Sequence, residues 1–338
     1  MSQKIKIMIL GGARENGKNM YAVQVEDEIF IMDAGLKYPD SSLLGIDVVI
    51  PDLQFFQDYA DKIAGIFLTH GHADSIGALP YILRDHDIPV FGSKLTIELA
   101  KIAVQRENRR RKNDLFHVID TDTEIEFKNA NVSFFKTTHS IPDSLGIDIS
   151  TKEGEIVYTG DFKFDPSAKK GYRTDFVRLS EIAQKGVLAL LSDSTNAEAN
   201  FPNDRQTSIE KYIYNIFENY DGRIIAAAKA SNIVRVQEIF QAAAATGRHV
   251  FLTGRDAGKI VYTAMKLGYL NVPKGLLVHS KDLKKIPDNE LVILETGRMG
   301  EPLKSLQKMA TNRHRMIKIK KGDLVFIATT PSHSVETM

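Results

Sequence analysis

The feature that most constrains the fold of this chain is a change of pattern near Pro202. Before it, short runs rich in Val, Ile, Phe and Tyr end at Gly, Asp, Asn or Pro, as β-strands do, with helical patterns only at about 76–84 and 93–110. After it, helical and strand-like patterns alternate, which predicts crossover connections and a parallel sheet. We therefore predict an α/β chain with one sandwich-like domain over residues 1–202 and a second, doubly wound domain over residues 203–338.

The second half can be divided further. Helices are expected over about 207–218, 231–245 and 257–268, with the strands GRIIAAA, RHVFLTG and ELVILETG between and after them. A last strand-like run, LVFIATT, is followed by no helical pattern. We therefore expect the chain to be truncated at its C-terminal end.

The chain has no cysteine, and this limits the chemistry available to it. Disulfide frameworks, thiolate nucleophiles and cysteine metal sites are excluded, so any metal has to be held by His, Asp or Glu. No segment has the roughly 18 apolar residues of a membrane span, and the first residues lack the apolar run of a secretory signal. A soluble, cytoplasmic protein without a membrane partner is therefore expected.

Charge is balanced over the whole chain but not locally. Lys and Arg number 44 and Asp and Glu 43, and the net charge of +1 indicates no nucleic-acid partner by itself. Two stretches, 101–112 and 302–322, are nevertheless strongly basic, and the second has seven cations and no acid. Such stretches are either solvated helix faces or surfaces for the phosphates of RNA, and both interpretations stay open.

The segment GGARENGKN matches a phosphate-binding loop only in part. Gly12, Gly17 and Lys18 fit the G-x-x-x-x-G-K spacing, but Asn19 stands where Ser or Thr would bind Mg²⁺. A strand-like run follows, so no helix N-terminus would face the phosphates. A glycine turn between two strands is the better interpretation.

The strongest chemical signal is LTHGHADS, residues 68–75, at the end of a strand of the buried type. His70 and His72 flank one glycine, so in an extended backbone their imidazoles point the same way and can reach one ion. Asp74 adds a carboxylate that could act as a ligand or a base. One histidine alone would usually be structural, so it is the whole H-x-H-x-D pattern that indicates a metal site.

Two more residues follow strands in the same way, His139 after NVSFFKTT and Asp161 after EIVYTG. Each is a weak signal, since an aspartate in a turn usually caps or shapes that turn. Together with the two histidines of LTHGHADS they supply three imidazoles and one carboxylate. That set suits one tetrahedral Zn²⁺ or part of an octahedral Mn²⁺ site.

Several motifs, taken in order, resemble one known family. LTHGHADSIGALPYIL, HSIPDSLGIDIS, YTGDFKFDPS and LLSDSTNAE resemble the successive motifs of the metallo-β-lactamase fold as used by ribonuclease J, an RNA-degrading nuclease with an inserted β-CASP domain. The likeness extends from about residue 8 to 330 through GGARENGKNM, IMDAGLKYPD, GIDVVIPD, GRIIAAAKASN and ILETGRMGEP. It implies an incomplete metallo-β-lactamase αββα sandwich over 1–202 and an inserted β-CASP domain with a parallel sheet over 203–338.

The resemblance also implies roles for the candidate residues. His70, His72 and His139 would bind a first metal, Asp161 would bridge to a second metal, and Asp74 would bind that second metal. Asp74 and Asp161 would then be catalytic, because two metal ions can activate a water molecule and hold the phosphodiester that it attacks. No protein nucleophile is required.

Ser75 departs from the family pattern H-x-H-x-D-H, which has histidine at that position. A serine hydroxyl is a poor ligand beside neutral imidazole, and its side chain is too short to replace the ring. The family's last metal-binding histidine and its downstream phosphate-binding motif would lie beyond Met338. We therefore predict one occupied metal site and a second site that is weak or empty.

The β-CASP-like half departs from the family as well. GRMGEP replaces a Gly-Ser-Gln-Gly-Glu-Pro loop, and ATTPSHSVE replaces a Pro-Gly-Asn-Glu stretch; both family loops are associated with RNA binding. Arg298, Ser231 and Asn232 are the candidate RNA- or phosphate-binding residues, although Arg298 fits a surface role equally well. Three acids match the family and would cap turns or orient the metal-binding histidines. These are Asp143, Asp165 and Asp193.

The resemblance implies one main function and one alternative. The main one is metal-dependent hydrolysis of single-stranded RNA by a 5′–3′ exonuclease, with endonuclease activity as an option, in rRNA processing and mRNA decay. The alternative is a feeble or inactive paralogue that serves as the structural partner of an active ribonuclease J, which the altered Ser75 favours. A homodimer or a hetero-oligomer with such a paralogue is expected. A lactamase-like or thioesterase-like hydrolase is the remaining option, but it has no use for the inserted domain.

Overall fold

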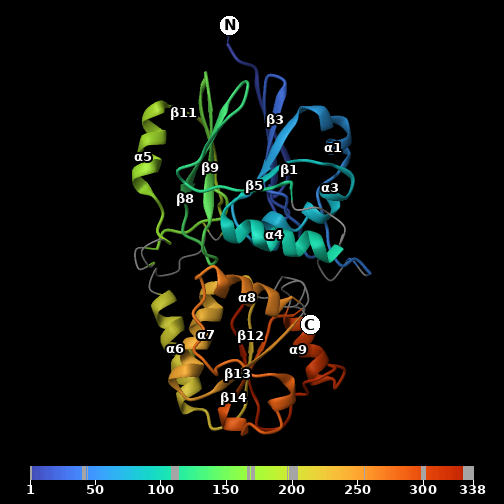
Figure 1. The fold of residues 1–338 in the computed structure, drawn as a ribbon, viewed down its shortest axis with the longest axis vertical. Helices are drawn as coiled ribbons and strands as arrows, with labels where there is room; N and C mark the ends of the chain where they lie inside the picture. The colour runs from blue at the N-terminus through green and yellow to red at the C-terminus, as the bar shows by residue number, and fades with distance from the viewer. Residues whose placement is uncertain are drawn as a thin grey trace. The chain divides into compact units, whose positions relative to one another are not determined.

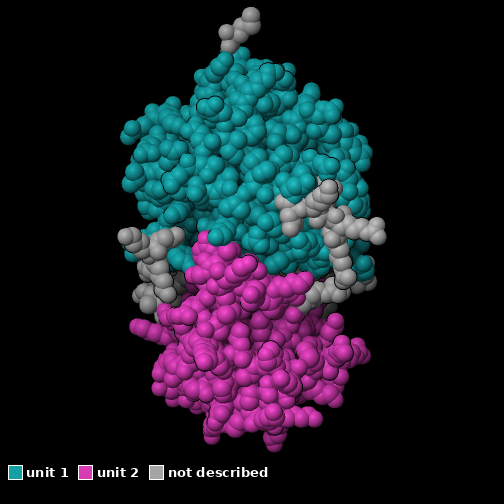
Figure 2. All heavy atoms as spheres, in the orientation of Figure 1, with its two compact units in different colours: residues 1–198 teal, residues 199–338 magenta. Residues whose placement is uncertain are grey.

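The computed structural model describes most of the chain. The described residues are 2–39, 43, 45–107, 114–165, 168, 172–195, 197, 205–254, 256–297 and 302–329. The chain divides into two compact units, residues 1–198 and 199–338, which have different colours in Figure 2. The predicted boundary between residues 202 and 203 lies outside the described residues, so it stays a prediction. Within the described ranges, no helix has both the length and the apolar character needed to cross a membrane.

The first unit contains a sheet with the strand order β1-β2-β3-β4-β5-β6. Its strands are β1 (Ile5–Gly11), β2 (Met20–Val25), β3 (Glu28–Met32), β4 (Ile63–Phe67), β5 (Val90–Gly92) and β6 (Phe116–Val118). Strands β1 to β3 pair antiparallel, whereas β3 to β6 pair parallel. Because β3 and β4 run in the same direction, the residues that follow them lie at the same edge of the sheet.

A second sheet of this unit has the order β11-β10-β9-β8-β7. Its strands are β7 (Glu124–Glu126), β8 (Asn131–Lys136), β9 (Leu145–Thr151), β10 (Gly154–Tyr158) and β11 (Val187–Leu191). Strands β8 and β10 both pair antiparallel with β9, and β11 pairs parallel with β10. The C-terminal ends of β8, β10 and β11 therefore share one edge.

Apolar side chains from both sheets fill the space between them. The buried core includes Val23, Phe30 and Phe67 from the first sheet and Phe134 and Ile147 from the second. The ring centroids of Phe67 and Phe134 are 6.4 Å apart, so the two sheets pack directly on each other. Figure 1 shows α5 on the outer side of one sheet and α1 and α3 beside the other. The helices of this unit are α1 (Gln54–Asp58), α2 (Ala73–Ile76), α3 (Leu79–Asp85), α4 (Lys94–Glu107) and α5 (Phe176–Lys185). The predicted αββα sandwich is confirmed.

The second unit is built on a parallel sheet with the order β13-β14-β12-β15. Its strands are β12 (Ile224–Ala227), β13 (His249–Thr253), β14 (Leu291–Glu295) and β15 (Leu324–Ile327). Its helices are α6 (Arg205–Asn219), α7 (Ile233–Ala245), α8 (Ala257–Lys266) and α9 (Pro302–Ala310). In Figure 1, α6 and α7 lie on one side of this sheet and α9 on the other, as expected for a doubly wound unit. The predicted parallel sheet is confirmed.

Local differences from the sequence-based expectation have physical causes. One helix is predicted over 76–84, whereas the structure has α2 and α3. Pro80 at the start of α3 has no N–H to continue the hydrogen bonds of α2. The pattern does not predict α1, α5 and α9. The glycine turn is confirmed: GGARENGKN joins the antiparallel β1 and β2, and Gly12 and Gly17 have φ of 87° and 91°.

Candidate metal centre

Segments that follow three strands carry the predicted metal ligands. Strand β4 ends at Phe67, and the next residues lead through His70 to His72, the N-cap residue of α2. His139 follows β8 and Asp161 follows β10. These strands consist largely of buried residues, many of them β-branched or aromatic. They hold the segments in place, so the candidate ligands lie on short connections between rigid elements.

Three histidines form the first ligand group. The ligand atoms of His70, His72 and His139 all lie within 4.8 Å of one another. Their ring centroids are 4.7–4.8 Å apart, and His139 Nε2 lies 3.0 Å from His72 Nδ1. Imidazole nitrogens that converge in this way from separate segments are a donor set for a divalent ion.

A second group shares His70 with two carboxylates. The ligand atoms of His70, Asp74 and Asp161 also lie within 4.8 Å of one another. His70 Nε2 is 3.5 Å from Asp74 Oδ1 and 4.0 Å from Asp161 Oδ2. The structure thus brings all five predicted ligands together.

Two buried atoms in these groups test whether a cation fits. His70 Nε2 and Asp74 Oδ1 are both shielded from solvent, and neither has a hydrogen-bond partner among the described residues. Buried polar atoms are normally satisfied, and an orphaned pair of a ring nitrogen and a carboxylate oxygen needs either a proton or a cation. The residues therefore fit a divalent metal ion.

The opposite side of the His70 ring is held by hydroxyl groups. Thr69 Oγ1 lies 2.9 Å from His70 Nδ1 and donates to the buried carboxylate of Asp33, which also accepts from Tyr158 at 2.9 Å. If Thr69 donates to Asp33, its oxygen can accept the Nδ1 proton of His70. That tautomer leaves Nε2 free for the metal.

Ser75 lies on this same side of the ring. It is fully buried, and its Oγ is 3.2 Å from His70 Nδ1, whereas the ligand set converges on Nε2. The hydroxyl therefore contacts a candidate ligand histidine on the side of the ring away from the other candidate ligands. Whether the second metal site is weak stays a prediction.

The titration of the site depends on burial and on close charges. Burial opposes protonation of His70, but the close carboxyl groups of Asp74 and Asp161 outweigh it and raise the His70 pKa to about 9. Burial lowers the pKa of His139 well below its usual value, and the charges of His70 and His72 add to this effect. Without a cation, the positive charge of the site is a proton on His70, which a divalent ion would displace.

The two carboxyl groups differ in their environment. Burial raises the pKa of Asp161 to about 7, and the charges of Asp74 and Asp193 add to it although His70 opposes them. Burial also disfavours ionisation of Asp74, but the close positive charge of His70 holds its pKa below the ordinary value. At neutral pH the carboxylate of Asp74 is thus charged, whereas that of Asp161 titrates near pH 7.

Sequence reasoning missed two supporting residues. Asp33 follows β3 in the run IMDAG, and its fully buried carboxylate accepts from the backbone N–H and the hydroxyl of Thr69. Asn19 donates from Nδ2 to Asp161 Oδ1 at 3.3 Å, and its backbone N–H donates to the carbonyl of Asp74. A strand that ends in an acid was the available signal for Asp33, and nothing in the sequence indicated the role of Asn19.

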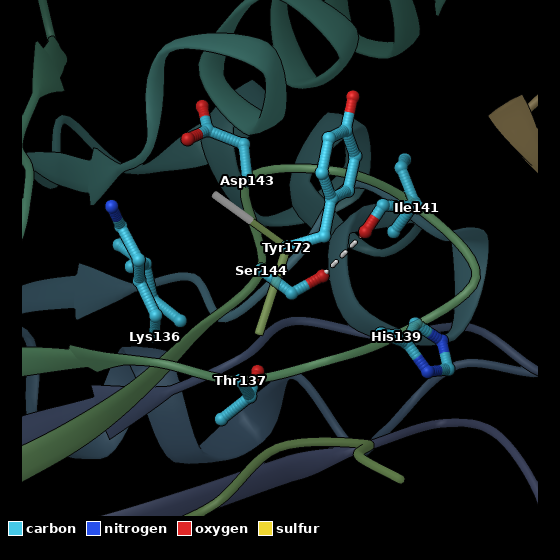
Figure 3. A pocket seen from close by; sticks show the side chains of 8 residues that line it. Lys136, Thr137, His139, Ile141, Asp143, Ser144 and Tyr172 are labelled. Atoms are coloured by element: carbon cyan, nitrogen blue, oxygen red, sulfur yellow. Dashed lines mark hydrogen bonds between the residues drawn. The ribbon is translucent and has the colours of Figure 1, made fainter. Parts of the chain in front are cut away.

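The three acids predicted to cap turns or orient histidines have these contacts. Asp143 Oδ2 accepts from the backbone N–H of Leu95 in the first turn of α4, and in Figure 3 its carboxylate points away from the His139 ring. Asp165 pairs with Lys163 at 3.2 Å. Asp193 Oδ1 accepts from a backbone N–H two residues on, while its charge raises the pKa of Asp161. Capping is therefore observed for Asp143 and Asp193, and orientation of the histidines stays a prediction.

The predicted RNA-binding residues belong to the second unit. Asn232 is the N-cap residue of α7, where its Oδ1 accepts from the N–H of Arg235, and Ser231 precedes it. Arg298 lies outside the described residues, as do residues 108–113 of the first basic stretch. In the stretch 302–322 the cationic side chains are exposed while Leu303, Leu306 and Met309 are buried. Their binding to RNA stays a prediction.

Comparison with known proteins identifies the families that match the two units of the chain. The model of the metallo-β-lactamase superfamily matches residues 13–211, and that of the ribonuclease J β-CASP domain matches residues 221–334. A solved structure of a protein of unknown function from Enterococcus faecalis V583 is similar with a TM-score of 0.63, covering 98% of this chain and 89% of that one. Its sequence identity of 13% supports the fold alone.

Curated relatives extend the comparison over the whole chain. A Ribonuclease J 2 from Streptococcus pyogenes serotype M3 is 56% identical over 335 residues, which are 99% of this chain and 61% of that protein. Ribonuclease J 2 proteins from Staphylococcus epidermidis and Staphylococcus aureus are 44% identical over 337 residues, 100% of this chain and 60% of theirs. The chain thus spans about three fifths of the length of these relatives. With both domain families matched in order, the chain belongs to the ribonuclease J family of the metallo-β-lactamase superfamily.

Proposed function

We propose that this chain is the catalytic part of a metal-dependent ribonuclease that hydrolyses phosphodiester bonds of single-stranded RNA. The observation that carries the proposal is the convergence of His70, His72, His139, Asp74 and Asp161, with two of their buried atoms lacking a partner. The match to the ribonuclease J β-CASP domain supports RNA as the substrate class. Degradation from the 5′ end, with internal cleavage as a second activity, is the mode we propose, in cytoplasmic rRNA processing and mRNA decay.

Each part of the ligand set has a separate task. A bound Zn²⁺ or Mn²⁺ would supply an activated water molecule and polarise the phosphate. The three imidazoles hold the ion without adding charge, whereas the carboxylate of Asp74 adds a negative charge that favours a divalent ion over a proton. Asn19 keeps one oxygen of Asp161 occupied by a hydrogen bond, so the other oxygen faces His70.

A single well-bound ion is the occupancy we propose. The imidazole group is complete, while the second group has His70, Asp74 and Asp161 with no further imidazole at Ser75. The hydroxyl of Ser75 is turned toward His70 Nδ1 and is not part of either group. Both Zn²⁺ and Mn²⁺ suit this mixture of nitrogen and oxygen ligands.

A second candidate function rests on the same position. If the loss of an imidazole at Ser75 leaves catalysis feeble, the protein would act mainly as a partner of an active ribonuclease J, as a hetero-oligomer, and otherwise as a homodimer. The buried hydroxyl contact of Ser75 with His70 favours this candidate, because the hydroxyl is turned toward Nδ1 and away from the ring nitrogen Nε2 on which the candidate ligands converge. The two candidates share the fold and the RNA substrate and differ in turnover.

The test is RNA decay by the full-length protein with and without added Mn²⁺ or Zn²⁺. Linear RNA with a 5′ monophosphate reports exonuclease activity, and circular RNA reports internal cleavage. The catalytic proposal expects metal-dependent loss of the linear RNA and no loss with H72A or H139A. If the wild type is as inert as these variants, the partner function is favoured. Activity that appears only after mixing with an active paralogue would support that function directly.

A further inference from the structure

A buried pair of carboxyl groups lies on the outer face of the second sheet, separate from the five candidate metal ligands. Asp148 on β9 is 0% exposed and Glu155 on β10 is 3% exposed. Asp148 is opposite Val157 and Glu155 is opposite Ser150, so the two acids are diagonal neighbours on one face. Two buried carboxylates in this arrangement repel each other unless one of them is protonated.

Each acid has one satisfied oxygen and one without a partner. Ser133 Oγ donates to Asp148 Oδ2 at 3.2 Å, and Ser150 Oγ donates to Glu155 Oε1 at 2.9 Å. Asp148 Oδ1 and Glu155 Oε2 are buried and receive no hydrogen bond from the described residues. A single proton between the acids supplies the missing donor. In agreement, burial and then the close carboxyl group of Glu155 raise the pKa of Asp148 to about 7.

Helix α5, which packs on this face, carries the nearby positive charges (Figure 1). Arg178 donates from Nη2 to Ser133 Oγ at 3.3 Å, and it also pairs with Glu181 at 3.1 Å. Lys185 at the end of the helix lowers the pKa of Asp148. Strands β8 and β9 contribute the hydroxyls of Ser133 and Ser150. These groups can balance one negative charge of the pair. Glu181 has the opposite effect, because it adds a negative charge to the same helix.

The apolar contact that holds α5 is small, so the polar contacts matter. Leu179 and Ile182 of the helix pack against Phe135 and Val157 of the sheet. The backbone N–H of Glu155 also donates to the carbonyl of Gly186, directly after the helix. A change of charge at the buried pair therefore acts on the sheet directly beneath α5.

The segment before α5 connects this helix to the metal centre. The N–H of Asp175, the helix N-cap, donates to the carbonyl of Lys136. The N–H of Thr174 donates to Thr138 Oγ1 at 2.9 Å, and the N–H of Thr138 donates back to Thr174 Oγ1 at 3.2 Å. Thr138 Oγ1 donates to the carbonyl of Tyr172 at 2.8 Å. Residues 172–175 thus support the backbone directly before His139.

We propose that Asp148 and Glu155 share one proton, and that this proton fastens α5 and the 172–175 segment behind His139, so that alkaline pH loosens both. The paired state has one negative charge and one hydrogen bond, which suits a buried position beneath one cationic helix. Loss of the proton leaves two facing carboxylates with no donor between them. The repulsion moves them apart, and α5 with its segment is released from the sheet.

The direction of the pH effect follows from the raised pKa. The unfolded chain loses this proton near the ordinary carboxyl pKa, whereas the folded chain keeps it to about pH 7. The contribution of the pair to stability is therefore fully present below the ordinary carboxyl pKa, declines above it, and is lost as the pH rises through about 7. The effect is confined to α5 and the segment before His139.

Amide hydrogen exchange of the full-length protein tests this directly. Between about pH 6 and about pH 8.5, after correction for the intrinsic rates, protection of α5 and of the Thr138 amide should fall at least about tenfold. Helix α7, in the second unit, should keep its protection. In D148N the amide group can donate to Glu155 at any pH, so the alkaline loss should disappear, and E155Q should behave in the same way.

A matched control variant and two possible results test whether Asp148 and Glu155 share a proton. Glu181→Gln removes a carboxylate from the same helix outside the pair, and it should keep the pH dependence of the wild type. The proposal would be overturned if α5 lost as much amide protection at alkaline pH in D148N as in the wild type. It would also be overturned if the protection of α5 in the wild type did not change with pH. If neither variant folds, the carboxyl ¹³C shift of Asp148 in the wild type decides it. A group already ionised at about pH 6 contradicts the shared proton, and one that titrates near pH 7 supports it.

Discussion

His70 is fully buried, and its two ring nitrogens face different partners. Nε2 faces Asp74 and Asp161, while Nδ1 faces the hydroxyls of Thr69 and Ser75. A hydroxyl that donates its one hydrogen to an acid can only accept a hydrogen bond from the imidazole on its other side. The hydrogen bond of Thr69 to the buried Asp33 therefore sets the tautomer that a metal at Nε2 requires.

The first prediction concerns Thr69. Thr69→Val removes the hydroxyl between Asp33 and His70 while keeping the shape of the side chain. We expect metal affinity to fall about 10- to 100-fold, as when other partners of ligand histidines are removed. The buried Asp33 carboxylate would keep the hydrogen bonds from the Thr69 backbone N–H and from Tyr158, and the loss of the hydroxyl donor should cost about 1–3 kcal/mol of stability. Competition with a Zn²⁺ chelator and urea unfolding measure the two effects.

Thr137 offers a matched control for that variant. It is a buried threonine two positions before His139, and its Oγ1 has no hydrogen-bond partner among the described residues. Thr137→Val should therefore leave metal affinity unchanged and cost no stability. If both valine variants lose affinity equally, the loss reflects general packing and the role given to Thr69 is wrong.

A second prediction concerns the number of ions. The wild-type protein should hold one Zn²⁺ or Mn²⁺ per chain after mild dialysis. Ser75→His supplies an imidazole beside Asp74 and should raise the count toward two and increase hydrolysis of 5′-monophosphorylated RNA. Ser75→Ala, which lacks both the imidazole and the hydroxyl, should not. Two tightly held ions in the wild type, measured by elemental analysis, would contradict the prediction.

The candidate metal ligands could be predicted from the sequence because their signal is local. His70, His72 and Asp74 are spaced within one strand end, and His139 follows another strand. The support of His70 could not be predicted in this way. Asp33 is 36 positions from Thr69 and 125 positions from Tyr158 in the sequence, and only the folded sandwich brings both residues into contact with its carboxylate.

At the level of elements, the ends of parallel strands and a few close backbone contacts form the site. Gly35 follows β3, and its N–H donates to the carbonyl of Asn19. A Cβ at Gly35 would lie 1.5 Å from the carbonyl oxygen of Asp74. Only a glycine at position 35 therefore lets the segment after β3 pass so close to helix α2, which carries Asp74.

The third prediction follows from this contact. Gly35→Ala should force the α2 backbone away from β3, destabilise the first unit by about 2 kcal/mol or more, and weaken metal binding. Gly258→Ala is the control, because that glycine is in α8 and a Cβ there would meet nothing within 4 Å. It should be neutral or stabilising by about 0.5–1 kcal/mol. Similar losses in both variants, measured by urea unfolding, would argue against a specific contact.

Helix signals differ in strength along the sequence. The alternation after Pro202 predicted α6, α7 and α8 because their apolar residues recur at helical spacing. Helix α5 was missed although its N-cap, Asp175, accepts from the N–H three residues on, which is a common start signal. In α9 the apolar positions Leu303, Leu306 and Met309 are separated by cations and polar residues. The many charges in this stretch therefore weaken the apolar pattern by which a helix is predicted.

At the scale of the whole molecule, each unit has its own core. The first is the sandwich interior, and the second contains Ile225, Ile293 and Met309. The ligand set belongs wholly to residues 70–161 of the first unit. A cation that binds only the folded site must therefore draw its stabilising effect from the folding of that unit. The net charge of +1 says nothing of this division, because it averages the two units.

The last prediction is that metal stabilises the two units unequally. At a Zn²⁺ concentration about 100 times the dissociation constant, the first unit should gain about 2.7 kcal/mol, and removal of the ion with a chelator should reverse the gain. Hydrogen exchange with and without the ion should show added protection in strands β4, β8 and β10 and none in β12 and β14. His139→Ala should abolish the gain while leaving the second unit as it was. Equal protection of both units by the ion would show that they fold as one cooperative body, and a gain that survives His139→Ala would place the ion elsewhere.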